Sequence, residues 1–353
     1  MPYRVVLWTT GHVASFAGRA VVEHPEMELV GAYAWSPEKA GVDVGELIGT
    51  GPLGITATSD VDELLALEPD VVGYYPIMRT EAIPEHVDTL CRFLENGVNV
   101  VSTANLITGR WWNAEERFDE SGRKGDASLF ASGVNPGFVN QLMLTAAGVC
   151  SEVTKLSVWE EAECSGYDSP ELWETVAFGH DPNEADIEAY FRQGTTVFED
   201  AVAMMADALE LSLDEIRYVP EVAVATKDLD LGWMFIKEGH VAGLKNTWLG
   251  IANGSEVIEL GTIWKMTEDV EPNWEVRHGW HVRIDGIPTV KMHFAGWPPE
   301  GRESDSELLM GLAMLMTALP TVHAIPHVVN ARPGVVTYKD LPLVTAAHCV
   351  KTS

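Results

Sequence analysis

Residues 4–18 read RVVLWTTGHVASFAG. The apolar run 5–8 ends at Thr9-Thr10-Gly11, and a helical pattern follows. A strand that turns through glycine into a helix is typical of a dinucleotide-binding fold, whose motif is G-x-G-x-x-G/A. Thr9, Gly11 and Ala14 hold the three glycine positions of that motif. This stretch therefore predicts a cofactor loop in which threonine replaces the first glycine.

The motif positions have separate roles. The middle glycine lets the backbone approach a pyrophosphate, and Gly11 keeps it. Ala14 is an accepted third residue, and Thr9 suits the turn if its backbone angles are ordinary. A helix from about residue 12 would aim free N–H groups at the phosphates. The loop alone also fits an ordinary strand–glycine–helix turn, but its place in the first strand–helix unit favours the cofactor.

The first 150 residues alternate between apolar strand patterns and helical patterns. The predicted strands are 4–8, 29–34, 71–75, 98–102 and 129–132. The predicted helices are 13–23, 61–67, 83–96 and 113–124. Such alternation indicates a parallel sheet covered on both faces, that is, a doubly wound α/β Rossmann domain over residues 1–150.

The middle of the chain has a different pattern. A long helical region at 183–210 precedes extended segments at 221–225, 241–251, 256–266 and 274–284. Asn253-Gly254 and Asp285-Gly286 are strong hairpin-turn signals. We expect a second, α+β domain over residues 151–303 with a mostly antiparallel sheet, serving the substrate or dimerisation.

The last segment, residues 304–353, is expected to return to the first domain. Residues 304–307 read SDSE, a capping box before the apolar run 308–319, which stops at Pro320. Twelve residues are too few to span a bilayer, so this run predicts a buried helix.

Composition excludes several classes of partner and site. The chain has 23 Lys+Arg against 53 Asp+Glu, a formal charge of −30, which disfavours nucleic acid and anionic membranes. The four cysteines lack metal-ligand spacing, and no His-rich motif occurs, so no metal site is predicted. No signal peptide is visible, and we expect a reducing, cytoplasmic location.

The segment after the second strand selects the nicotinamide cofactor. Ser36 and Lys39 favour NADP, because a hydroxyl and a cation accept a 2′-phosphate. Trp35 could lie against the adenine. Glu38 would suit the ribose of NAD, so NAD stays possible.

A second motif follows the fifth predicted strand. Residues 133–138 read GVNPGF, residues 167–171 read YDSPE, and Pro326, Ala331, Pro333 and Gly334 come later. Over nearly its whole length the chain resembles the dihydrodipicolinate-reductase-like superfamily. More closely, it resembles the group of 2,4-diaminopentanoate dehydrogenases and native amine dehydrogenases.

This resemblance implies NAD(P)H-dependent reduction of an imine made from a carbonyl compound and ammonia, with oxidative deamination as the reverse. It also implies a homodimer formed mostly by the second domain. By position, the resemblance assigns two further groups of residues, besides Ser36 and Lys39, to the cofactor site. The pyrophosphate loop is Thr9, Thr10, Gly11, His12 and Val13, and the nicotinamide end is Tyr75, Pro76, Thr103, Asn135 and Pro136.

One position departs from the pattern of the group. Amine dehydrogenases of this group carry a glutamate just after the strand at 98–102, where it binds ammonia and handles a proton. This chain has Asn105 there, and Asn140-Gln141 where a second acid is common. Asn105 can hydrogen-bond ammonia or a carbonyl oxygen but takes no proton near neutral pH.

The second domain offers other proton donors. Glu160 lies among Glu161 and Glu163 and could reach a cleft, although such acids are also typical of a solvated strand. Tyr167 could reach a cleft too, or belong to a turn. Eight of the twelve tryptophans lie in this domain and favour an apolar ketone or aldehyde substrate.

Three functions remain open from the sequence. The first is amine dehydrogenation, with Asn105, Glu160 and Tyr167 as candidate catalytic residues. The second is an NADPH-dependent carbonyl reductase that does not use ammonia. The third is a catalytically silent, NADP-binding regulatory protein.

Overall fold

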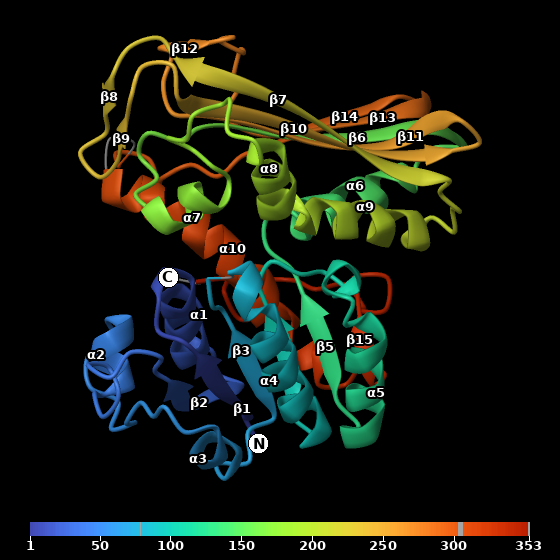
Figure 1. The fold of residues 1–353 in the computed structure, drawn as a ribbon. Coiled ribbons are helices and arrows are strands. Elements are labelled where there is room, and N and C mark those ends of the chain that lie inside the picture. Colours follow the sequence, from blue (N-terminus) through green and yellow to red (C-terminus); the bar gives the residue numbers. More distant parts are fainter. Residues whose placement is uncertain (78, 303–305, 352–353) are drawn as a thin grey trace. The chain divides into compact units, whose positions relative to one another are not determined.

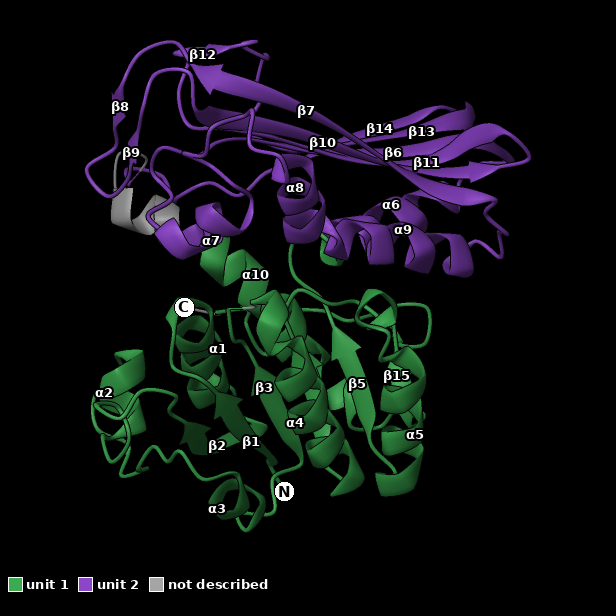
Figure 2. Ribbon diagram, in the orientation of Figure 1, with its two compact units in different colours: residues 1–138, 313–353 green, residues 139–312 purple. Residues whose placement is uncertain are grey.

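The computed structural model describes residues 1–77, 79–302 and 306–351 (Figure 1). The chain divides into two compact units, shown in Figure 2. Unit 1 comprises Met1–Phe138 and Ala313–Ser353, and unit 2 comprises Val139–Leu312.

Unit 1 is built on a six-stranded parallel sheet in the order β15-β5-β4-β3-β1-β2. Its strands are β1 Tyr3–Trp8, β2 Met27–Tyr33, β3 Val71–Tyr74, β4 Asn99–Ser102, β5 Ser128–Ala131 and β15 Gly334–Val336. The chain proceeds from β1 to β2 on one side and returns to β3 on the other, so β1 and β3 flank a topological switch point. The predicted Rossmann sheet is confirmed.

Helices cover both faces of this sheet. They are α1 His12–Glu23, α2 Val44–Ile48, α3 Val61–Leu65, α4 Ile83–Glu95 and α5 Glu115–Gly125, with short 3₁₀ turns at Thr80–Ala82 and Arg110–Trp112. Alternate residues of β1 enter different cores: Val5 and Leu7 pack with α1, whereas Val6 and Trp8 pack with α4. This alternation is the period-two pattern of a doubly covered strand. The sequence analysis did not predict α2.

The helix α10, Ser306–Val328, contradicts the predicted stop at Pro320. It continues through both Pro320 and Pro326, although each proline lacks an N–H for the helix ladder. Ala318, Val322 and Ile325 are fully buried in the core of unit 1, and this packing offsets the missing bonds. From Ala313 onward the chain belongs to unit 1, and β15 extends the sheet beyond β5.

Because α10 is longer than predicted, Gly311–Val328 is long and apolar enough to cross a membrane by length and composition alone. Its buried face within unit 1 is the pattern of a core helix. The predicted capping box depends on Ser304, which lies outside the described residues.

Unit 2 contains a seven-stranded sheet in the order β12-β7-β10-β11-β6-β13-β14. The strands are β6 Glu152–Glu163, β7 Glu215–Ala225, β10 Val241–Ala252, β11 Ser255–Lys265, β12 Val270–Glu271, β13 Gly279–Ile287 and β14 Val290–Phe294. Only the β6–β11 pair among these is parallel, so the prediction of a mostly antiparallel sheet is confirmed. A two-stranded ribbon joins β8 Leu229–Asp230 to β9 Phe235–Ile236.

The helices of unit 2 lie along one face of this sheet (Figure 1). They are α6 Phe138–Ala147, α7 Pro170–Thr175, α8 Ile187–Thr195 and α9 Val197–Ala208. The helical region predicted over 183–210 contains two helices, α8 and α9, which are separated at Thr196. At the break, the Thr195 and Thr196 hydroxyls donate to the carbonyls of Phe191 and Arg192. Such back-bonding competes with the helix ladder.

The two hairpin predictions have different outcomes. Asn253 and Gly254, with φ of 51° and 74°, form the turn between β10 and β11 as predicted. Asp285 and Gly286 instead lie within β13 at a register shift opposite β6. A Cβ on Gly286 would lie 2.0 Å from the carbonyl oxygen of Glu152, so the glycine serves a close backbone approach rather than a turn.

Candidate functional site

The loops that follow β1 to β5 meet at one edge of unit 1, because all these strands run parallel. Ligands of open α/β sheets bind at this carboxyl edge, next to the switch point. The predicted cofactor residues of unit 1 all lie on these loops or at the start of α1.

Thr9 does not have the ordinary backbone angles that the sequence analysis assumed. Its φ is 83°, the left-handed conformation that the first glycine of the motif normally supplies. A β-branched residue rarely adopts this conformation. The Thr9 N–H donates to the Tyr33 carbonyl at 3.2 Å, and its hydroxyl donates to the Tyr75 carbonyl at 3.4 Å. The tight turn is therefore retained without glycine.

Gly11 is the N-cap residue of α1, and the space beside its Cα is empty. Its φ of −76° and ψ of −174° suit any residue, and nothing lies within 4 Å of the position of an added Cβ. No side chain caps α1, and its first turn holds no acid. The first intrahelical bond runs from Ser15 N to Gly11 O, so the N–H groups of residues 12–14 have no acceptor within the helix. This cradle fits a pyrophosphate.

The segment after β2 fits an additional phosphate. The Ser36 hydroxyl oxygen is buried and lies beside Glu38, whose pKa is lowered by its own backbone N–H and by the Ser36 hydroxyl. The Lys39 N–H donates to the Ser36 carbonyl at 3.0 Å, so Lys39 lies on the same tight turn. Trp35 is 65% exposed and open to a flat ligand. Glu38 is exposed on this turn as well.

Tyr75 directs its ring into the core rather than to the sheet edge. The ring is buried, and its hydroxyl forms a 3.1 Å hydrogen bond with the Thr321 hydroxyl of α10. Burial raises the pKa of Tyr75 to about 12. The ring of Tyr75 therefore does not line the predicted cofactor site. At this end of β3 only the backbone of Tyr75, followed by Pro76, can do so.

Asn105 lies in the loop after β4 with a φ of 47°. Its N–H donates to the Thr103 carbonyl at 2.8 Å, and its own carbonyl accepts from the Trp111 indole at 3.5 Å. Asparagine and aspartate tolerate the left-handed conformation better than glutamate does. The backbone thus offers a conformational reason for an amide at this position.

The loop after β5 is held by hydrogen bonds between its own backbone groups. Gly133 N–H donates to the Pro136 carbonyl, and Phe138 N–H donates to the Gly133 carbonyl, both at 3.0 Å. The Ser132 hydroxyl lies 2.9 Å from the Tyr338 hydroxyl. These bonds fix Asn135 and Pro136 at the carboxyl edge.

In unit 2, Glu160 is held by two tryptophans that the sequence analysis did not connect with it. Its Oε1 accepts from the Trp264 indole at 2.9 Å, and its Oε2 accepts from the Trp280 indole at 2.8 Å. Trp264 comes from β11 and Trp280 from β13, the two strands that flank β6. Only the strand order brings these side chains together.

Glu161 and Glu163 have other environments. Glu161 points to the opposite face of β6 and accepts from the Arg277 N–H at 2.8 Å. Glu163 is exposed and accepts from the Ser165 N–H at 2.8 Å. Of the three acids, only Glu160 lies among the tryptophans.

Tyr167 belongs to the same aromatic group as Glu160. Its ring contacts Trp173 edge to face at 5.7 Å, and Trp173 contacts Trp264 in the same way at 6.1 Å. Burial, with a smaller contribution from the charges of Cys164 and Glu160, raises the pKa of Tyr167. We call Glu160, Tyr167, Trp173, Trp264 and Trp280 the aromatic–carboxylate group.

Among the described residues, no three His, Cys, Asp or Glu side chains gather so as to hold a metal ion.

The fold and the unit 1 cradle define a class of protein, a Rossmann-type oxidoreductase that depends on a nicotinamide dinucleotide. Within that class, the chain belongs to the 2,4-diaminopentanoate dehydrogenase family. The family model for the 2,4-diaminopentanoate dehydrogenase C-terminal domain matches residues 138–351, more than half of the chain. The resemblance found in the sequence is confirmed.

Several relatives are similar over most of their length. An amine dehydrogenase of Streptomyces virginiae is 29% identical, covering 96% of each chain. A 2,4-diaminopentanoate dehydrogenase of Acetoanaerobium sticklandii is 25% identical, covering 87% of this chain and 88% of its own. The solved structure of an amine dehydrogenase from Mycobacterium smegmatis shares the fold with a TM-score of 0.79 at 19% identity, over 98% of this chain and 97% of its own. The chain is an amine dehydrogenase-like oxidoreductase.

Proposed function

We propose that the chain is an NADP-preferring amine dehydrogenase. It reduces the imine formed from an apolar ketone or aldehyde and ammonia, and it oxidatively deaminates the amine in reverse. The observation that carries the amine assignment is the Glu160 carboxylate, which lies within a group of aromatic side chains and accepts two indole hydrogen bonds.

The residues of unit 1 bind and orient the cofactor. The loop Thr9–Val13 surrounds the pyrophosphate, with the free N–H groups at the start of α1 as donors. Ser36 and Lys39 hold the 2′-phosphate, and Trp35 stacks on the adenine. When bound, the reduced nicotinamide supplies the hydride. NAD binds more weakly, because it has no 2′-phosphate to pair with the Lys39 ammonium.

The loops after β3, β4 and β5 surround the nicotinamide end. The backbone of Tyr75 with Pro76, then Thr103, and finally Asn135 with Pro136 line this part. The Asn105 amide orients the carbonyl oxygen or ammonia by hydrogen bonding but transfers no proton.

Glu160 takes over the role of the acid that is missing after β4. Its carboxylate attracts an ammonium ion, and the indole N–H groups of Trp264 and Trp280 hold the carboxylate in place. Glu160 accepts a proton from ammonium, which frees ammonia to add to the carbonyl carbon. The oxygen leaves as water with two protons, this one and a second that Glu160 moves from the nitrogen of the adduct, and the iminium of the substrate remains. Tyr167 orients the carboxylate, and the surrounding indoles favour an apolar substrate.

The test follows absorbance of NADPH with a panel of ketones and aldehydes, with and without ammonium. We expect oxidation that requires both ketone and ammonium. Glu160→Gln should lower this rate by about 100-fold, in line with the loss of a general acid–base group, and leave NADPH affinity unchanged. The matched control is Glu163→Gln, which removes an exposed carboxylate and should retain activity. Equal losses in both variants would contradict the role of Glu160.

A carbonyl reductase is the second candidate, and the amide of Asn105 favours it. It predicts NADPH oxidation with ketone at the same rate whether or not ammonium is present. That outcome would replace the amine assignment but keep the cofactor assignment.

We also propose a homodimer formed mostly through unit 2, in a reducing, cytoplasmic location, with small molecules rather than nucleic acid or membranes as partners. The resemblance supports the dimer, and the four free cysteines agree with the compartment. Light scattering coupled to size exclusion should give twice the chain mass of 38.6 kDa. A monomeric mass would contradict the dimer.

A further inference from the structure

A histidine of unit 2 lies between two carboxylates that the proposed reaction does not use. The His180 Nε2 lies 3.1 Å from Glu174 Oε1, and its Nδ1 lies 3.1 Å from Glu184 Oε2. A neutral imidazole carries a hydrogen on only one ring nitrogen, and an ionised carboxylate can only accept. Both hydrogen bonds therefore form together only when the His180 ring is an imidazolium with both nitrogens protonated.

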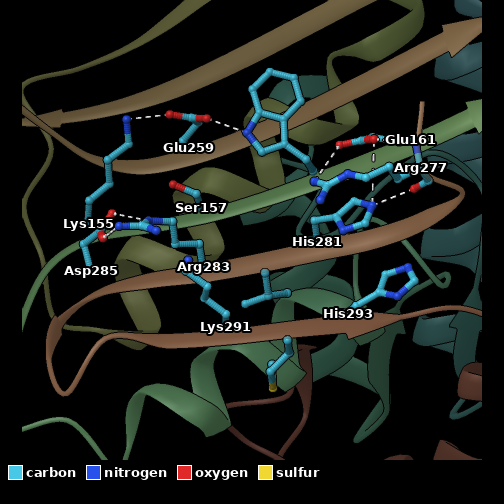
Figure 3. A pocket seen from close by; sticks show the side chains of 13 residues that line it. Lys155, Ser157, Glu161, Glu259, Arg277, His281, Arg283, Asp285, Lys291 and His293 are labelled. Carbon is cyan, nitrogen blue, oxygen red and sulfur yellow. Dashed lines mark hydrogen bonds and ion pairs between the residues drawn. The ribbon is translucent and has the colours of Figure 1, made fainter. Parts of the chain in front are cut away.

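The other histidines near carboxylates differ from His180. In the described part of the chain, each of those within 4.0 Å of a carboxylate has a single such partner. The His281 Nε2, for example, lies 3.8 Å from Glu161 Oε2 but only 2.6 Å from the Arg277 carbonyl (Figure 3). A neutral ring satisfies that arrangement. The requirement for a charged ring thus distinguishes His180.

The backbone of His180 is anchored to the sheet of unit 2. The Gly179 N–H donates to the Val241 carbonyl at 2.8 Å, and the Val241 N–H donates to the His180 carbonyl at 2.9 Å. Val241 is the first residue of β10 and is fully buried. The ring therefore extends from a fixed point. Glu174 precedes it on α7, and Glu184 follows it in the segment 181–186 before α8.

Glu174 connects this contact with the aromatic–carboxylate group. Its neighbour Trp173 on α7 is buried and packs edge to face against both Tyr167 and Trp264. The Trp173 indole also donates to the Tyr167 carbonyl at 2.9 Å. A contact that holds the end of α7 therefore helps to hold Trp173 and Tyr167 in place.

The surroundings of the His180 ring are mainly acidic. The Glu184 carboxylate also accepts from the Asp181 N–H at 3.2 Å, and the Tyr190 ring of α8 lies 5.5 Å from the imidazole, centroid to centroid. The titratable and charged groups around His180, from α7, the segment 181–186, α8 and the loop before β10, are Glu174, Asp181, Glu184, Tyr190, Lys237 and His240. When the ring is neutral, two glutamates face it without a cation between them and repel each other.

The contacts also set the pH range in which the ring is charged. Burial lowers the pKa of His180, but the hydrogen bonds to Glu184 and Glu174 outweigh burial, so the pKa lies above its usual value. An unfolded histidine titrates near pH 6.5. The stabilisation from the two ion pairs is therefore complete below that pH and is lost as the pH rises through the higher folded-state value.

We propose that His180 is a pH-dependent latch, which holds α7 and the segment 181–186 together near neutral pH and releases them at alkaline pH. When the ring gives up a proton to solvent, one glutamate keeps its hydrogen bond and the other faces a nitrogen lone pair. The end of α7 is then less constrained, and so are Trp173 and Tyr167. The latch lies within unit 2 and stands independently of the proposed reaction.

Hydrogen exchange measured by mass spectrometry on the full-length protein tests the latch. Protection factors, which remove the intrinsic effect of pH on exchange, are compared at about pH 6 and about pH 9 for peptides covering α7 and residues 181–186. In the wild type, protection should fall about fivefold between the two conditions, the value of two partly exposed ion pairs. His180→Gln should show the lower protection in both conditions, because glutamine carries no charge.

The matched control is His240→Gln. It removes a neighbouring histidine whose Nδ1 lies 3.3 Å from the Glu238 carbonyl and which pairs with no carboxylate in the described chain. It should keep the pH dependence of the wild type. Glu184→Gln leaves one carboxylate on the ring and should reduce the pH dependence. Thermal unfolding shows whether each variant is folded, and Glu184→Gln decides the test if His180→Gln is not.

Three outcomes would overturn the latch. The first is equal wild-type protection of these peptides in both conditions. The second is an undiminished fall in His180→Gln and Glu184→Gln, or its loss in His240→Gln. The third is a fall of the same size in the peptides of α9, which would show a general loosening of unit 2 rather than release at His180.

Discussion

The Thr9 hydroxyl donates a hydrogen bond to the carbonyl of Tyr75 and so links the ends of the neighbouring strands β1 and β3. This contact lies at the switch point of the unit 1 sheet, where the cofactor is expected. Thr9 holds a φ of 83° while it makes the contact. The hydrogen bond and the turn together keep the loop in the conformation that glycine would otherwise supply.

Replacing Thr9 tests whether this conformation is strained. A positive φ costs a non-glycine residue roughly 1–3 kcal/mol. Thr9→Gly removes that cost but loses the hydrogen bond and gains unfolded-state freedom, so we expect unfolding free energy to rise by at most about 1 kcal/mol. Thr9→Val keeps the strain without the hydroxyl and should lose about 1 kcal/mol. Urea unfolding measures both. A greater loss of stability in Thr9→Gly than in Thr9→Val would contradict the strain, and a stabilising Thr9→Val would contradict the contribution of the hydroxyl.

Gly11→Ala separates folding from cofactor binding. The backbone angles of Gly11 are ordinary, and the added methyl group meets no atom within 4 Å. Unfolding free energy should therefore change by less than about 0.5 kcal/mol. The methyl group occupies the space proposed for the pyrophosphate, so affinity for NADPH should fall at least about tenfold. Unchanged NADPH affinity, measured by fluorescence titration, would show that the cradle is an ordinary turn.

Ser36→Ala tests the preference for NADP. The Ser36 hydroxyl interacts with the exposed Glu38 carboxylate, so its removal should change the unfolding free energy little. Affinity for NADPH should fall about fivefold, the value of one hydrogen bond, with NADH affinity unchanged. The measurement is the ratio of the two dissociation constants in wild type and variant. A parallel loss for both cofactors would place Ser36 away from the 2′-phosphate.

Asn105 is best replaced by aspartate rather than glutamate. At a φ of 47°, glutamate should cost about 1 kcal/mol of stability, whereas aspartate tolerates the left-handed region. Asn105→Asp thus adds a carboxylate without backbone strain, and we expect it to raise ammonium-dependent turnover. Steady-state rates over a range of ammonium concentrations provide the measurement. If Asn105→Asp lowers the rate and Asn105→Glu raises it, side-chain reach outweighs backbone conformation.

Acid should destabilise the chain through its buried histidines. Burial lowers the pKa of His86, whose Nδ1 lies 2.5 Å from the Tyr74 hydroxyl. The native state keeps His86 neutral while the unfolded chain takes up a proton near pH 6.5, so unfolding free energy falls as the pH drops below that value. His86→Gln should reduce this slope between pH 7 and pH 5. Urea unfolding across that range measures it, and an unchanged slope would exclude His86 as a contributor.

Much of unit 1 was predictable because its signals are local. The apolar run before Thr9 and the repeated strand–helix alternation depend on residues adjacent in sequence, as does the hairpin signal at Asn253-Gly254 in unit 2. Other features depended on distant partners. Gly286 looked like a turn residue, but its role is set by the backbone of Glu152 on β6. Pro320 looked like a helix stop, but burial of its neighbours in unit 1 carries α10 past it.

The sequence by itself determined the parallel α/β unit and the likeness to amine dehydrogenases, and it predicted the position of the cofactor loop. Periodicity and short motifs encode these features, so they can be predicted without knowing which distant segments pair. Only the tertiary structure decided which acid of β6 lies among tryptophans and that Thr9 adopts a left-handed turn. These outcomes depend on strand order and register, which place residues more than 100 positions apart side by side.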